Sequence, residues 1–158
     1  MITWKDLCED PSLEDLPYKI ELTKDGTIEM SPTRTRHAIY QSRIDTLLHE
    51  LMRRGQMLVE VAVMTADNVK VADVAWASDE RTRIISDELS CSIAPEICVE
   101  VWSPSNTRKK MDKKKKLYLG AGALEFWYCD KDGNISFFDA DGERERSKLC
   151  PKFPRSVG

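Results

Sequence analysis

Two apolar segments of this chain each place an acidic residue where a β-strand would bury it. Residues 69–76 contain Asp73, and residues 95–102 contain Glu100. A carboxylate inside a buried strand loses hydration worth roughly several kcal/mol unless it is paired or binds a metal. The chain must therefore fold so that both acids are neutralised, and divalent-metal phosphodiester chemistry is one way to use them.

A lysine-rich segment follows the second acid. Seven of the nine residues 108–116 are Lys or Arg. On a helix, Met111, either Lys114 or Lys115, and Tyr118 share one face, so one central lysine points inward while its neighbours face solvent. Periodicity alone leaves the choice between residues 114 and 115 open.

Length and charge limit what the chain can be. A total of 158 residues with 41% hydrophobic residues suits one domain, residues 1–158, with a single core. The net charge of −3 argues against non-specific coating of nucleic acid and leaves only local basic surfaces for that purpose.

Five widely spaced cysteines form no C-x-x-C pair, which argues against a disulfide framework or a zinc site and favours a reducing compartment. Neither a signal peptide nor an apolar stretch of about 18 residues is visible. We therefore expect a soluble, cytoplasmic protein with no membrane partner.

The pattern along the chain predicts a mixed α/β domain. Alternating residues around Asp25-Gly26 predict an N-terminal β-hairpin, residues 18–22 and 27–30. The expected core, about residues 33–130, runs helix, three strands, helix, strand. The first helix spans about 33–54, the strands 57–64, 69–76 and 96–102, and the second helix, capped within residues 103–106, runs to about Leu119. A strand at 124–129 and an edge strand at 134–138 follow, and residues 139–148 read as a polar turn.

If the second and third core strands are neighbours, Asp73 and Glu100 can converge. With the carbonyl of Val101 they would offer oxygen ligands suited to Mg²⁺, for which Mn²⁺ could substitute. The metal would polarise a phosphate and activate water, and the inward lysine would assist the attack. The alternative interpretation is a structural network in which Lys114 or His37 neutralises two buried acids.

The sequence resembles the PD-(D/E)XK restriction-endonuclease-like superfamily, and within it the Uma-type endonucleases, over about residues 17–154. The matching segments are residues 18–22, 29–32, His37, 71–74, 100–105, Lys114 with Tyr118, and 122–127. The resemblance implies a restriction-endonuclease-like core, with Asp73 and Glu100 as metal-binding carboxylates and Lys114 as the catalytic lysine. The superfamily pattern has proline where Ala72 stands and lysine where Trp102 stands. The resemblance therefore implies that Lys114 of the second helix supplies the lysine that is missing from the strand.

Further residues have candidate roles. His37, on the inner stripe of the first helix, is similar to a histidine of the family motif, and Glu60, which we expect to be buried in the first core strand, could contact the metal or orient Lys114. The alternative is a core histidine and a structural acid. Arg108, Lys109 and Lys110 are candidate DNA-backbone contacts, although most such runs are simply solvated helix faces.

Together these observations predict a Mg²⁺-dependent endonuclease that hydrolyses DNA, with a homodimer suited to cutting both strands. The alternative from another class is a catalytically silent nucleic-acid-binding or scaffold domain of the same fold. A third hypothesis is a nuclease acting on RNA or on branched or damaged DNA. Sequence-specific readout would have to come from loops such as residues 77–94.

Overall fold

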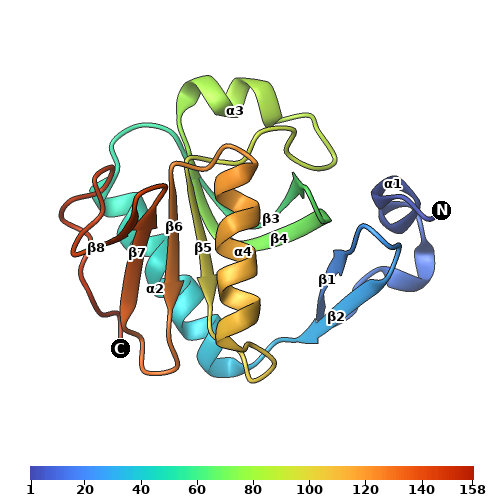
Figure 1. The fold of residues 1–158 in the computed structure, drawn as a ribbon, viewed down its shortest axis with the longest axis horizontal. Coiled ribbons are helices and arrows are strands. Elements are labelled where there is room, and N and C mark those ends of the chain that lie inside the picture. The colour runs from blue at the N-terminus through green and yellow to red at the C-terminus, as the bar shows by residue number, and fades with distance from the viewer.

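A six-stranded mixed sheet forms the centre of the computed structural model, which describes residues 1–158 (Figure 1). The strands follow the chain in order: β3 (Gln56–Thr65), β4 (Asn68–Ala77), β5 (Ile97–Val101), β6 (Glu125–Cys129), β7 (Ile135–Asp139) and β8 (Gly142–Arg144). Only β5 and β6 pair in parallel. Their connection needs a crossover, which α4 (Arg108–Gly120) supplies.

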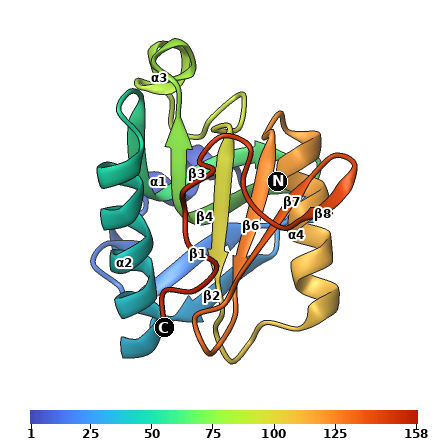
Figure 2. The ribbon, with the colours of Figure 1, turned by 90° about the vertical axis from the view of Figure 1, so that its left-hand side faces the viewer.

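Two helices cover opposite faces of this sheet. Figure 2 shows α2 (Thr35–Leu51) on one side of the strands and α4 on the other. Tyr40, Ile44 and Leu48 recur along α2 at intervals of four residues, and all three are buried. They join an apolar cluster that also contains Trp127 and, from the C-terminal segment, Phe153.

The face under α4 holds the second apolar cluster. Tyr118 and Phe126 stack there with ring centroids 6.0 Å apart, and Cys98 of β5 belongs to the same cluster. Because successive strand residues point to opposite faces, Glu100 lies on the α4 side together with Cys98. This alternation brings an acid of β5 under the lysine-rich helix.

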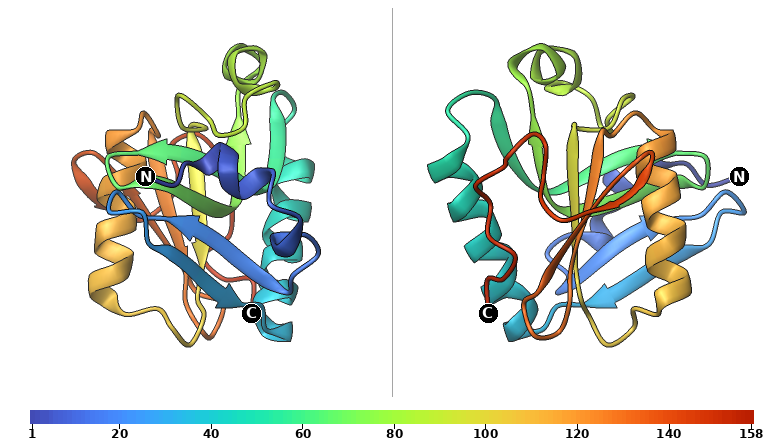
Figure 3. Two further views of the ribbon diagram at one scale, coloured as in Figure 1. Left: turned by 90° about the vertical axis from the view of Figure 1, so that its right-hand side faces the viewer. Right: turned by 60° about the vertical axis from the view of Figure 1, so that its left-hand side comes forward.

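The N-terminal hairpin is a separate two-stranded sheet beside the main one, formed by β1 (Tyr18–Leu22) and β2 (Ile28–Pro32) (Figures 1 and 3). Gly26 takes φ +81 in the predicted Asp25-Gly26 turn. Register pairs Lys19 with Ser31 on one face and Ile20 with Met30 on the other. Ile20 faces α1 (Trp4–Cys8), whose Leu7 lines the same hollow, so the charged face turns toward β4.

The expected mixed α/β order of helix, three strands, helix and strand is confirmed, and three local expectations are corrected. Thr107, not residues 103–106, caps α4: its side chain accepts a hydrogen bond from the Lys110 N–H. The expected loop at 77–94 contains α3 (Asp79–Ile85), which Ser78 caps. β8 pairs with β7, so residues 134–138 are not at the edge, because a tight turn at Gly142 folds the polar segment back.

Two further observations complete the description. A short 3-10 helix, η1 (Pro11–Leu13), links α1 to the hairpin. None of the helices combines the length and the apolar character that crossing a membrane requires.

Candidate active site

The register of β4 and β5 places Asp73 opposite Glu100. Val74 pairs with Val99 in this antiparallel ladder, so Asp73, one residue before Val74, lies opposite Glu100, one residue after Val99. Residues that lie opposite each other in a ladder point to the same face of the sheet. Asp73 is 1% exposed and Glu100 is 2% exposed. The sequence-based expectation that the two acids converge if their strands are neighbours therefore matches the structure.

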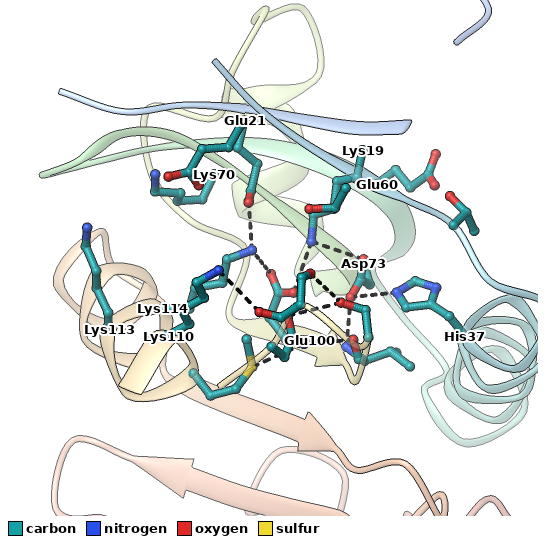
Figure 4. A pocket seen from close by; sticks show the side chains of 18 of the residues that line it. Lys19, Glu21, His37, Glu60, Lys70, Asp73, Glu100, Lys110, Lys113 and Lys114 are labelled. Atoms are coloured by element: carbon teal, nitrogen blue, oxygen red, sulfur yellow. Dashed lines mark hydrogen bonds and ion pairs between the residues drawn. The ribbon is translucent and has the colours of Figure 1, made fainter. Parts of the chain in front are cut away.

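A lysine from the hairpin lies between the two carboxylates (Figure 4). Lys19 Nζ is 3.2 Å from Asp73 Oδ1 and 3.0 Å from Glu100 Oε2. Burial alone would lower the pKa of Lys19, but the two acids and the nearby Glu21 raise it well above its usual range. The ammonium is therefore charged, and it is shared by both acids.

Asp73 has two more partners, one from α2 and one from β5. His37 Nε2 lies 3.2 Å from Asp73 Oδ2, and the backbone N–H of Val101 donates to the same oxygen at 2.8 Å. Burial acts to raise the pKa of Asp73, but Lys19, His37 and this N–H together hold it below its ordinary value. His37 Nδ1 is buried and has no hydrogen-bond partner. The predicted histidine thus reaches the site from the first turn of α2.

Glu100 is contacted from α4. Its Oε1 accepts a hydrogen bond of 2.8 Å from the Tyr118 hydroxyl and lies 3.2 Å from Lys114 Nζ. Burial raises the pKa of Glu100 above its usual value in spite of the two lysines, and the charge of Asp73 acts in the same direction. The two acids thus differ: Asp73 favours the ionised form more strongly than Glu100 does.

The structure resolves the choice between the two central lysines. Lys114 points inward and also contacts Glu21 Oε2 at 2.8 Å. Lys115 instead lies over the Phe138 ring, 4.6 Å from its centroid. Glu21 accepts the Val71 N–H at 2.7 Å, which fixes its carboxylate beside Lys114.

Lys19 and Glu21 are two hairpin residues of the site to which the sequence analysis assigns no role. Both lie within the matching segment 18–22, but the resemblance attaches no function to either residue. The signal was the alternation of residues 18–22, which puts both charged side chains on one face of the hairpin. What the pattern does not reveal is that this charged face turns inward.

Glu60 does not behave as expected. It is exposed rather than buried, and its φ of +53 is a left-handed conformation within β3. Val59 pairs with Val74 and Val61 with Ala72, whereas Glu60 and Asp73 between them are not paired. The interruption turns Glu60 out of the ladder, although it still lines the pocket, so the prediction of a buried strand acid is wrong.

The basic residues at the start of α4 are exposed. Arg108, Lys109 and Lys110 form no salt bridge, and Lys110 Nζ donates to the Ser105 carbonyl at 3.2 Å. Lys110 lines the pocket, as does Lys113, which pairs with Asp67 at 2.7 Å. The mouth of the pocket thus carries positive charge on the α4 side.

The pocket encloses about 200 Å³ between the hairpin, β4, β5, α4 and the start of α2. No group of three or more His, Cys, Asp or Glu side chains is arranged to hold a metal ion. Mg²⁺ often uses only one or two carboxylates and keeps several waters. Asp73 and Glu100 direct one oxygen each at a common point, where a lysine ammonium already lies, so the donor set fits a small hard cation.

Comparison with known proteins agrees with this fold. The model of the Uma2 family, described as "Putative restriction endonuclease", matches residues 6–152. A solved structure described as a putative nuclease belonging to DUF820, from Anabaena variabilis ATCC 29413, is similar with a TM-score of 0.77 and 19% sequence identity, covering 99% of this chain and 95% of that one. At that identity the likeness concerns the fold alone. No curated protein matches the chain.

Proposed function

The chain belongs to the Uma2 family, whose description is that of a nuclease, and from this premise we propose that it is a Mg²⁺-dependent endonuclease that hydrolyses phosphodiester bonds in DNA. The observation that carries the proposal is the buried pair Asp73 and Glu100, which share one cation between them in a pocket with Lys114 beside it. Buried acids with shifted pKa values in a cleft are typical of functional sites.

Asp73 and Glu100 would hold the metal, and Mn²⁺ would serve in place of Mg²⁺. When bound, such a cation polarises the phosphate and lowers the pKa of water. Lys114 places a positive charge at the edge of the pair, where it would stabilise negative charge on the phosphorus oxygens or orient the attacking water. Glu21 holds Lys114 in place from the other side.

His37 and Tyr118 would act through the carboxylates. His37 contacts the Asp73 oxygen that faces away from Lys19, and Tyr118 donates to the Glu100 oxygen that Lys114 also reaches. Each fixes the direction of one carboxylate, which limits the rearrangement needed before the reaction. Both are therefore proposed as positioning residues.

Arg108, Lys109 and Lys110 would contact the phosphate backbone of the substrate. Their exposure and their place beside the pocket support this role, because several phosphate contacts are needed for useful affinity at physiological salt. A homodimer would present two such sites to the two strands of a duplex. Sedimentation with and without a short duplex tests the dimer.

The test of the proposed function is nicking of supercoiled plasmid with Mg²⁺, Mn²⁺ or EDTA, compared with calorimetric metal binding in the same samples. We expect cleavage with either metal, none with EDTA, and loss of both binding and cleavage in Asp73→Asn and Glu100→Gln. Matched controls are Asp87→Asn and Glu145→Gln, two exposed acids away from the pocket. Metal binding without cleavage of DNA would contradict the proposal.

One observation favours a second function, a silent nucleic-acid-binding domain of the same fold. Lys19, Lys114 and His37 already pair with the two acids, as a purely structural network would require. In that case the wild-type protein would bind nucleic acid but no divalent metal, and Asp73→Asn would leave that binding unchanged.

A further inference from the structure

We infer that Lys19 is a built-in counter-ion that competes with the divalent cation, so that the β1–β2 hairpin sets the metal affinity of the site. The inference rests on the proposed function, because it takes Asp73 and Glu100 as the metal ligands. It assigns the hairpin, which lies outside the main sheet, a direct part in loading the site.

The geometry leaves one position for two cations. Lys19 Nζ lies 3.2 Å from Asp73 Oδ1 and 3.0 Å from Glu100 Oε2, so one ammonium bridges one oxygen of each acid. Asp73 and Glu100 would hold a divalent cation through oxygens that Lys19 now occupies. Two positive charges shared by the same pair of carboxylates repel strongly in a buried site, so the ammonium must leave when the metal enters.

Lys19 differs in this respect from the other lysine of the site. Lys114 reaches Glu100 Oε1 and Glu21, but it makes no ion pair with Asp73. It lies beside the pair of acids rather than between them. A divalent cation can therefore bind the two acids with Lys114 in place, whereas it cannot do so with Lys19 in place.

The side chain of Lys19 has a way out. It is 14% exposed and lines the pocket, so its ammonium can turn toward water without passing through the apolar clusters. Glu29 and Glu60 line the same pocket, are exposed and form no ion pairs. A released ammonium thus finds other acids nearby, which lowers the cost of its displacement.

The first test is calorimetric titration of Mn²⁺ into the full chain, comparing wild type with Lys19→Met, Lys19→Arg and Lys113→Met. Lys113 lines the same pocket but pairs with Asp67, so its variant controls for loss of one positive charge. We expect Lys19→Met to lower the Kd for Mn²⁺ by about tenfold or more, because the two acids lose their internal cation. Lys19→Arg, which keeps the charge, should bind as weakly as wild type.

A second test uses the wild-type protein and so does not depend on a variant folding. An amine-reactive reagent is applied with and without Mg²⁺, and the labelling of each lysine is read by mass spectrometry. Lys19 should be protected without metal and label several times faster with it, whereas exposed Lys116 should label at the same rate in both conditions.

The outcomes separate this inference from the proposed function. If wild type binds Mn²⁺ but Lys19→Met binds no tighter than Lys113→Met, or if Lys19 stays equally protected with Mg²⁺, the competition is refuted while the metal site stands. If no variant binds metal, both fail. If competition is observed but no nucleic acid is cleaved, the inference holds and the nuclease proposal fails.

Discussion

The Tyr118 hydroxyl donates a hydrogen bond of 2.8 Å to Oε1 of Glu100, one of the residues that line the pocket. Both residues are buried, so the bond is shielded from water. It supports the charged form of a carboxylate whose pKa burial raises, and it joins the apolar cluster under α4 to the chemistry of the site. Replacing this one hydroxyl should therefore affect both stability and metal binding.

We expect Tyr118→Phe to lower the free energy of unfolding by about 1.5–3 kcal/mol, the usual range for a hydrogen bond to a charged group. The ring still packs on Phe126, so the loss is that of the hydroxyl alone. Urea denaturation measures it. Tyr128→Phe is the matched control, because the Tyr128 hydroxyl makes no hydrogen bond, and its variant should be nearly neutral. Equal losses in the two variants would show that the bond to Glu100 contributes nothing.

Lys114→Met should be both destabilising and inactive. The substitution leaves Glu21 and Glu100 without one of their cations, which typically costs about 3 kcal/mol for a buried pair. Denaturant unfolding gives the stability, and plasmid nicking in Mg²⁺ gives the activity, which we expect to fall by about two orders of magnitude or more. Lys116→Met, on the exposed face of the same helix, should change neither. Retained nicking in Lys114→Met would remove the lysine from the proposed mechanism.

Glu60→Gly should stabilise the protein by about 1 kcal/mol, because glycine adopts the left-handed conformation at this position without steric cost. Thermal or urea unfolding provides the measurement. Gln56→Gly is the control: this exposed residue lies at the start of the same strand, where glycine should destabilise. If nicking survives in Glu60→Gly, the side chain is not needed for metal binding. A loss of stability in this variant would mean that the backbone at Glu60 is not strained.

Protonation of Asp67 should lower the free energy of unfolding at acidic pH. Burial acts to raise the pKa of this carboxyl, but Lys113, the Lys24 N–H and Lys70 hold it well below its ordinary value of 3.8. The unfolded chain therefore takes up the proton first as pH falls, so the stabilisation by Asp67 is complete above about pH 5 and is lost progressively below pH 4. We expect the difference in unfolding free energy between wild type and Asp67→Asn to shrink over this range. A difference that stays constant from pH 6 to pH 3 would contradict the assignment.

Replacing Arg108, Lys109 and Lys110 together by Gln should weaken DNA binding and reduce its salt dependence. Each lost phosphate contact lowers the slope of log K against log salt by about 0.9. Fluorescence anisotropy with a duplex, in an Asp73→Asn background that prevents cleavage, measures the slope. The control replaces three exposed cations elsewhere, Arg53, Arg54 and Lys152. An unchanged slope in the α4 variant would mean that these residues are a solvated helix face.

Much of the fold follows from local patterns in the sequence. The Asp25-Gly26 turn specifies the hairpin, and the spacing of Tyr40, Ile44 and Leu48 specifies α2, because a turn type and an amphipathic stripe are local properties. The sequence pattern does not predict the two short elements α3 and β8. α3 has a cap at Ser78 and acids in its first turn, but its seven residues carry too little periodicity to outweigh the appearance of a loop. β8, with three residues, depends wholly on its pairing with β7.

The part of the site that the sequence predicts is the pair of acids, because the alternation of side chains along a strand determines which face each acid occupies. Acids in two apolar strands must share a face if the strands pair in the observed register, and Asp73 and Glu100 do. The contribution of Lys19 was not predictable, because alternation shows that Lys19 and Glu21 lie on one face but not which face meets the sheet. Tertiary packing of Ile20 against α1 decides that. The exposure of Glu60 depends on the left-handed backbone conformation of this one residue, which neither the composition nor the periodicity of the sequence predicts.

Neither apolar cluster contains a residue from the β1–β2 hairpin, although Leu22 of β1 is fully buried, and buried charges such as Lys19 and Glu21 join the hairpin to the rest of the fold. We therefore expect the hairpin to open as a unit while the sheet remains intact, so that its backbone amides exchange with solvent deuterium before those of β5 and β6. Such partial opening would expose both acids to a long polymer at a small fraction of the cost of global unfolding.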